Sequence, residues 1–144
     1  MKRLVLGVVL AVLPLAALAA PPVGEVLPTV TLSGKEGGRV TGEAWSSDEI
    51  QGKVYVMSYV DPDEKDLNDH VTQALKEQAF PQDRYGSIAA INMAATGLPN
   101  SLINRSLKSK QKEFPDTIYL KDMRKVLVEA WGVDDDNNDV LVFA

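Results

Sequence analysis

The chain has 144 residues, with 15 basic and 20 acidic side chains, a net charge of −5, one histidine and no cysteine. This length predicts one domain, and the missing cysteines exclude disulfides, thiolate-ligated zinc, iron–sulfur clusters and a cysteine nucleophile. The single histidine excludes a multi-histidine metal site, and the acidic balance argues against a nucleic-acid-binding surface, which needs clustered positive charge.

Residues 1–19 have the pattern of a cleaved secretory signal peptide. Lys2 and Arg3 precede an apolar run, and Ala17-Leu18-Ala19 places small residues at the two positions that a signal peptidase recognises. The run is shorter than the ~20 apolar residues that span a bilayer, which argues against a membrane anchor. We therefore expect cleavage after Ala19, a mature domain of residues 20–144 in the periplasm, and no membrane attachment after cleavage.

The first half of the mature chain predicts an extended edge segment, a core strand and a helix. Val26–Leu32 is the edge segment, and the β-branched and aromatic run Val54–Val60 is typical of a strand buried on both faces. Asp61 can cap the helix, with Pro62 in its first position and Glu64 completing a capping box. The apolar residues at helical spacing are Leu67, Val71, Ala74, Leu75 and Ala79.

The second half repeats the alternation of strand and helix. Ser87–Asn92 is expected to be a strand, and the next helix ends before Pro115. Thr117–Leu120 and Val126–Val128 are expected to form a hairpin, and Val140–Phe143 a final buried strand. This order predicts an α/β fold, a parallel or mixed sheet with flanking helices. The inner stripe of the second helix is assigned to Leu102, Ile103, Leu107 and Phe114.

A first set of segments comprises Gly24-Glu25, Leu27-Pro28 with Val30 and Leu32, Gly52-Lys53-Val54 and the insert from Phe114-Pro115-Asp116 to Asp122. With the order of strands and helices, this set resembles a thioredoxin-like fold, in its peroxiredoxin and thiol-reductase branch. A second set comprises Trp45-Ser46-Ser47 before Gly52-Lys53-Val54, Phe80-Pro81-Gln82-Asp83-Arg84-Tyr85, Ile91-Asn92 and Arg105-Ser106-Leu107. This set more closely resembles the YtfJ family of secreted thioredoxin-like proteins. The similarity spans residues 24–144 and implies a mixed sheet with flanking helices.

Two departures from the thioredoxin pattern concern redox function. Redox members carry C-x-x-C where the first core strand meets its helix, because the helix amino terminus stabilises a thiolate. This chain has Tyr59-Val60-Asp61-Pro62-Asp63-Glu64 at that junction, and no proline precedes Val140, where redox members have a cis-proline. The chain is therefore expected to lack thiol–disulfide activity.

The resemblance also implies a further strand and a closing helix after the last strand. The sequence stops at Ala144, directly after Val140–Phe143. We expect a domain that lacks its carboxy-terminal strand and helix, because an unpaired apolar edge strand is usually covered. The alternative is a family member that dispenses with them.

The candidate binding site is the vacated redox position, assigned to Tyr59, Asp61, Asp63, Glu64 and Arg84. Carboxylates at a helix start could act as a general base or cation ligand, but the same residue types serve as caps and dipole partners. The Arg84 guanidinium could bind a ligand carboxylate, or the loop could close on itself.

Two other features have weaker functional interpretations. The alternation Asp134-x-Asp136-x-Asn138 resembles the start of a calcium loop, but Asp139 stands where glycine is needed and no glutamate follows. A solvated turn is the simpler interpretation. His70 is expected at the boundary of the first helix's apolar stripe, without a catalytic role. No metal site and no cofactor is assigned.

Two hypotheses remain. The first is a periplasmic, non-redox binding or adaptor module for a protein, peptide or small ligand. The second is a non-redox enzyme or metal-binding protein that uses the carboxylates Asp61, Asp63 and Glu64. An enzyme should lose turnover when Asp63 and Glu64 become amides, whereas a binding module has no turnover to lose.

Overall fold

The β-branched run that begins at Val54 forms the strand β4 (Val54–Val60), with the bounds that the sequence predicts. A computed structural model describes residues 20–144, and its main sheet has the order β2-β6-β5-β4-β7. Strands β4, β5 (Tyr85–Asn92) and β6 (Thr117–Asp122) are parallel. The flanking strands β2 (Gly37–Arg39) and β7 (Asn138–Phe143) are antiparallel to their neighbours, so the sheet is mixed, as predicted.

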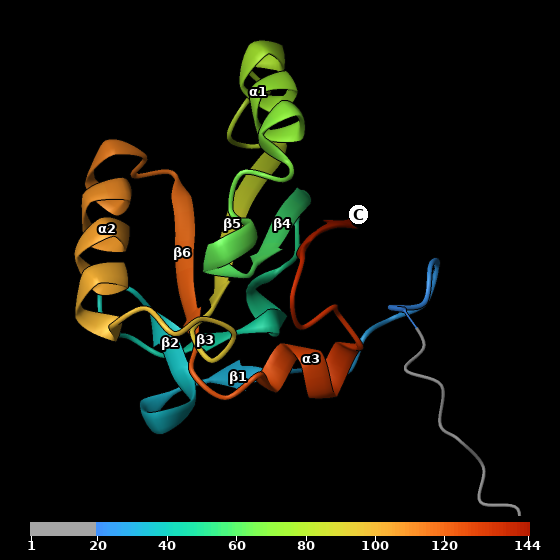
Figure 1. Ribbon diagram of the computed structural model, residues 1–144. Helices are drawn as coiled ribbons and strands as arrows, with labels where there is room; N and C mark the ends of the chain where they lie inside the picture. Colours follow the sequence, from blue (N-terminus) through green and yellow to red (C-terminus); the bar gives the residue numbers. More distant parts are fainter. Residues whose placement is uncertain (1–19) are drawn as a thin grey trace, which may run out of the picture.

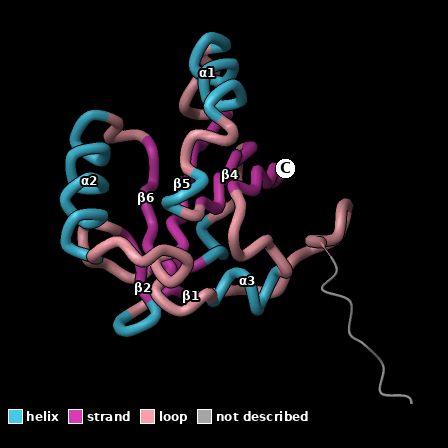
Figure 2. The backbone as a smooth tube through the Cα atoms, in the orientation of Figure 1, coloured by secondary structure: helices cyan, strands magenta, loops and turns pink. Residues whose placement is uncertain are grey.

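Alternate residues of the strands feed two apolar layers, one on each face of the sheet. One layer contains Met57, Ile88 and Leu120 together with the aromatic side chains of Trp45 and Trp131. The other layer contains Val60 and Ile91 of the sheet with Ile103 and Leu107 of the helix α2 (Asn100–Glu113), which runs beside β6 in both views (Figure 1, Figure 2). Both faces of the parallel strands are thus covered.

The amino-terminal part of the described chain forms a small second sheet. Strands β1 (Thr31–Leu32) and β3 (Trp45–Ser46) pair antiparallel, so the expected segment Val26–Leu32 is extended β structure only at its end. The 3₁₀ helices η1 (Gly34–Glu36) and η2 (Ser47–Glu49) flank it. Gly37 adopts a φ of 127°, and a Cβ there would lie 1.9 Å from the Lys121 carbonyl oxygen, so only glycine permits this close pairing of β2 with β6.

The first helical region differs from the prediction. Asp61 and Pro62 start a 3₁₀ helix, η3 (Pro62–Glu64), and the α-helix α1 begins only at Asp69 and ends at Gln78. No residue of α1 is buried, and Leu67 is 53% exposed. The helix extends beyond the end of the sheet instead of lying flat on it (Figure 1). The expected boundary position of His70 is also wrong, since this residue is exposed.

The predicted hairpin is wrong, because Val126–Trp131 forms the helix α3. The side chain of Asp122 accepts hydrogen bonds from the backbone N–H groups of Val126 and Leu127, which starts a helical turn. The pairing position beside β6 is taken by β2. In α2, Ile103 and Leu107 are buried as predicted, but Leu102 is 56% exposed.

The last strand is a half-buried edge and not a fully buried strand. Strand β7 pairs with β4 alone in the described part of the chain, and Val142 is 66% exposed. Within residues 20–144 no helix has the length and apolar character needed to cross a membrane. The predicted signal peptide, residues 1–19, lies outside the described residues.

Candidate functional site

The junction between β4 and η3 is built around the buried side chain of Asp61. Its carboxylate accepts a hydrogen bond of 2.8 Å from the Asp63 N–H, and its own N–H donates to the Asn137 carbonyl oxygen at 2.8 Å. Pro62 occupies the first helical position, where the missing N–H costs no hydrogen bond. Asp61 is therefore the predicted cap, but Glu64 does not complete a capping box with it. The Asp61 side chain thus serves as an internal cap and is 5% exposed.

The other two carboxylates of the junction are exposed. Asp63 Oδ1 accepts a hydrogen bond of 3.1 Å from the Thr96 hydroxyl, which links η3 to the loop after β5. Glu64 and Leu98 are exposed beside them in η3 and in that loop. We call Asp63, Glu64, Thr96 and Leu98 the rim. The Thr96 hydroxyl also accepts a hydrogen bond of 3.2 Å from the Leu98 N–H, so the rim offers two carboxylates and an apolar side chain to a partner.

Tyr59 belongs to a buried network below the rim. Its hydroxyl donates to Asp122 Oδ2 at 3.0 Å, and both residues are at most 1% exposed. The Asp122 carboxylate also accepts from the N–H groups of Arg124 at 3.2 Å, Val126 at 2.9 Å and Leu127 at 2.9 Å. Burial, followed by the negative charge of Asp122, raises the pKa of Tyr59 well above its usual value. The Asp122 carboxylate thus joins the Tyr59 hydroxyl of β4 to the first turn of α3.

A second network fastens the acidic loop before β7. The fully buried Asn92 donates from Nδ2 to the backbone oxygen and to Oδ1 of Asp135, both at 2.9 Å. Lys125 Nζ donates to Asp135 Oδ2 at 2.5 Å, and this bond lowers the pKa of the Asp135 carboxyl. The pKa is lowered further by the Asn92 hydrogen bond and the Lys125 charge, against the opposing effect of burial.

The side chains of the acidic loop Asp134–Asp139, whose alternation resembles the start of a calcium loop, do not converge on one point. Asp139 Oδ2 accepts from the Asp134 N–H at 2.7 Å, while Asp135 turns toward Lys125. In residues 20–144, no group of three or more acidic or histidine side chains is placed to hold a metal ion. The loop acts as a hydrogen-bonded turn in this geometry.

Arg84 lies at the other end of the strands. It precedes β5, and its backbone oxygen accepts a hydrogen bond of 3.1 Å from the Val54 N–H. The parallel register pairs Val54 with Tyr85 and Val60 with Ile91, so the length of β4 separates Arg84 from Asp61. The structure therefore brings Tyr59, Asp61, Asp63 and Glu64 together at the carboxyl ends of the strands and leaves Arg84 out.

Sequence reasoning missed Asn92, Asp122 and Asp135, the residues that organise this edge. A signal for Asn92 was present, because it is a polar residue at the end of a predicted strand, whereas Asp122 was assigned to the turn of the predicted hairpin. In parallel sheets such positions meet at one edge, where ligand sites usually lie. Here these side chains bind the protein's own backbone and each other.

Comparison with solved structures shows which class of fold the chain has. Similar solved structures are thioredoxin-like: the thioredoxin domain of a thiol-disulfide oxidoreductase from Bacteroides vulgatus has a TM-score of 0.54 at 13% identity, over 85% of this chain and 81% of that one. A putative thioredoxin from Neisseria meningitidis has a TM-score of 0.51 at 16% identity, over 75% and 65% of the two chains. The chain therefore has a thioredoxin-like fold, without any cysteine.

Within that class, the chain belongs to the family described as "Bacterial protein of unknown function (YtfJ_HI0045)", which matches residues 26–144. It is also 28% identical over 104 residues to the uncharacterized protein YtfJ of Escherichia coli (strain K12). That match covers 69% of this chain and 56% of the relative, so the chain spans little more than half of the relative's length.

Proposed function

We propose that this chain is a periplasmic binding or adaptor module that has no thiol–disulfide activity and binds its partner at the rim. One observation carries the proposal: the position of the redox thiol in the fold holds Asp61, whose carboxylate is buried and hydrogen-bonded to the Asp63 N–H. The exposed groups beside it suit recognition better than covalent chemistry.

The charge of the rim specifies the kind of partner. Asp63 and Glu64 are exposed carboxylates, and Leu98 adds a 48% exposed apolar side chain. Such a surface complements a protein or peptide segment that presents basic groups beside an apolar one. A net charge of −5 over the chain favours the approach of a positively charged partner.

The experiment is crosslinking in living cells from a photoreactive residue at position 98, compared with position 51. Gln51 is exposed and precedes β4, so it lies at the opposite edge and serves as the control. A specific adduct from position 98 alone, weakened in D63N/E64Q, supports the proposal. Equal adducts from both positions, or an adduct indifferent to D63N/E64Q, contradict binding at the rim.

Two simpler measurements test the remaining parts. Reduction of insulin disulfides by the purified chain would contradict the non-redox assignment. Mass spectrometry of protein from the periplasm is expected to give an amino terminus at Ala20, and an intact Met1 would contradict signal cleavage.

A further inference from the structure

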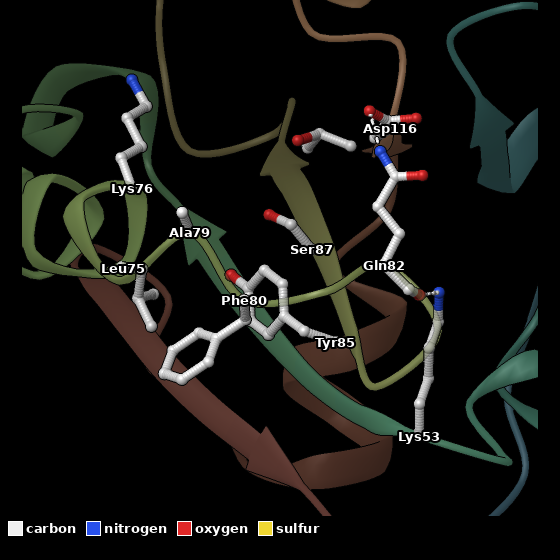
Figure 3. Close-up of a pocket in the computed structure, with 10 residues that line it drawn as sticks. Lys53, Leu75, Lys76, Ala79, Phe80, Gln82, Tyr85, Ser87 and Asp116 are labelled. Atoms are coloured by element: carbon white, nitrogen blue, oxygen red, sulfur yellow. Dashed lines mark hydrogen bonds between the residues drawn. The ribbon is translucent and has the colours of Figure 1, made fainter.

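A cavity of about 270 Å³ opens at the amino-terminal ends of β5 and β6, at the edge of the sheet opposite the rim. Its floor is made by Ser87 and Thr117, which are paired in register across the two strands. Leu75 and Ala79 at the end of α1 form one side. Figure 3 shows Ser87 on β5 between the end of α1 and the loop that carries Gln82.

The cavity has an aromatic wall. The rings of Phe80 and Tyr85 lie with their centroids 5.6 Å apart, tilted by 42°. Ala79 adopts a left-handed conformation with a φ of 47°, which ends α1 and turns the chain into Phe80. Phe80 remains 47% exposed, so apolar surface is left uncovered beside the floor. This wall can cover the ring of a small ligand.

Two charged groups of the cavity are already engaged. Lys53 Nζ donates to the Gln82 backbone oxygen at 2.8 Å and lies 5.3 Å from the centroid of the Tyr55 ring. Asp116 accepts a hydrogen bond from Gln82 Nε2. These contacts fix the loop Pro81–Arg84 against the start of β6 and leave little capacity for a ligand.

Lys76, unlike Lys53 and Asp116, forms no hydrogen bond in the described part of the chain. Its ammonium lies 4.7 Å from the centroid of the Phe114 ring, and in the described part of the chain it forms no ion pair and no hydrogen bond. The hydroxyls of Tyr85 and Ser87 likewise have no hydrogen-bond partner among residues 20–144. The lining thus contains one lysine whose only contact of this kind is with an aromatic ring, and two hydroxyls without a hydrogen-bond partner, in the described part of the chain.

We propose that this cavity is a second binding site, for a small aryl carboxylate, distinct from the rim. Lys76 would bind the carboxylate, the hydroxyl groups of Tyr85 and Ser87 would donate to it, and Phe80 would cover the ring. The volume lies just below the ~300–1,000 Å³ typical of ligand sites, which suits a small molecule and not a folded partner.

The helix dipoles provide the strongest argument against an anion. The carboxyl ends of α1 and α2 both lie at this edge of the sheet, and their partial negative charges favour cations. Lys76 lies in the last turn of α1 and offsets that field. The sign of the ligand's charge is therefore the sharpest test of the proposal.

The test is a titration of the purified chain with phenylacetate, followed by amide chemical shifts, with phenethylamine at the same ionic strength as the charge control. The proposal predicts saturable shifts at Ala79 and Ser87 with phenylacetate and weaker binding of phenethylamine. Removal of a charge-assisted hydrogen bond in Lys76→Gln should raise the Kd about tenfold. Lys108→Gln, an exposed lysine on α2, should leave it unchanged.

A second variant tests the cavity without changing any charge. Ser87→Val fills the floor and should also abolish the saturable shifts, with a spectrum that remains dispersed as evidence of folding. Absence of saturation in the unmodified chain, equal or tighter binding of phenethylamine, or an unchanged Kd in Lys76→Gln would overturn the proposal. None of these outcomes bears on the rim.

Discussion

The parallel strands differ at their two ends, the carboxyl edge and the amino edge, in whether the polar side chains there have hydrogen-bond partners within the chain. At the carboxyl edge, the buried side chains of Tyr59, Asn92 and Asp122 form hydrogen bonds within the chain. At the amino ends, Lys76 and Ser87 are among the residues that line a cavity of about 270 Å³, and neither forms an ion pair or a side-chain hydrogen bond among the described residues.

This difference distinguishes groups that hold the fold together from groups that a ligand could contact. Ligands of open parallel sheets usually bind at the carboxyl edge. Here, among the described residues, the carboxyl ends of the strands are occupied by internal hydrogen bonds beneath the acidic rim, and a cavity lies at the amino ends of β5 and β6. Groups with internal partners should therefore control stability, and groups without them should control binding.

The largest effect is expected from Asp122→Ala. The substitution removes a fully buried carboxylate and leaves the Tyr59 hydroxyl and three backbone N–H groups without their acceptor. The free energy of unfolding should fall by about 3–5 kcal/mol, measured by urea denaturation. Asp116→Asn, at an exposed residue of the amino edge, is the control and should change it by less than ~0.5 kcal/mol. Equal losses would contradict the division between the edges.

A smaller effect is expected from Tyr59→Phe, with a characteristic pH dependence. Loss of the hydrogen bond to Asp122 should cost about 1–2 kcal/mol. Because the folded chain raises the pKa of Tyr59, this residue's stabilisation is complete below its ordinary value of 10.0 and declines as the pH rises above it. Denaturation between pH 8 and 11 should show this decline in the unmodified chain and a weaker one in the variant. Identical slopes would show that Tyr59 ionises normally.

Lys125→Gln should lower the free energy of unfolding by a still smaller amount, which depends on pH and on salt concentration. The pair with Asp135 is partly exposed, with side-chain exposures of 36% and 40%, so its loss should cost under ~1 kcal/mol. The pKa of Asp135 is lowered in the folded chain, so the stabilisation is complete above the ordinary value of 3.8 and is lost as the pH falls below it. The difference between the two proteins should shrink at low pH and in high salt. A constant difference would point to packing of the lysine stem instead.

The smallest effect on stability is expected from Lys76→Gln and Ser87→Ala at the amino edge. In the described part of the chain, Ser87 has no side-chain hydrogen bond and Lys76 has no ion pair and only an exposed contact with the Phe114 ring, so each substitution should change the free energy of unfolding by ~0.5 kcal/mol or less. Thermal denaturation is the measurement. A loss above about 1 kcal/mol would mean that these groups have structural partners and would weaken the comparison of the edges.

The order of strands and helices could be predicted from local pattern, and the exceptions have physical causes. Val54–Val60 is a strand because a β-branched and aromatic run favours the pleated backbone. Val126–Val128 has the same local character but is helical, because the distant strand β2 pairs with β6 and the Asp122 carboxylate starts α3. That outcome depends on a partner about 85 residues earlier, which local pattern does not contain.

The part of the candidate site that lies next to β4 could also be predicted from local sequence, and the rest could not. Asp61, Asp63 and Glu64 lie together at the end of β4, because they follow a predicted strand directly. Arg84 lies at the opposite end of the strands, because it precedes β5 and β5 runs parallel to β4. Predicting the role of Asp122, or the cavity beside Ser87, would have required the pairing of β4, β5 and β6 to be known.

The sequence by itself determined the α/β class, the boundaries of β4, the cap at Asp61 and the absence of thiol chemistry, because each depends on residue type or on neighbouring residues. Only the tertiary structure decided which polar groups became internal partners and which stayed free. Tyr59 and Tyr85 illustrate this division: both are tyrosines on neighbouring strands, yet Tyr59 is buried against Asp122, while Tyr85 lines the open cavity. Because β4 and β5 run parallel, the end of one strand and the start of the other lie at opposite ends of the sheet, and neither stretch of sequence alone specifies that parallel pairing.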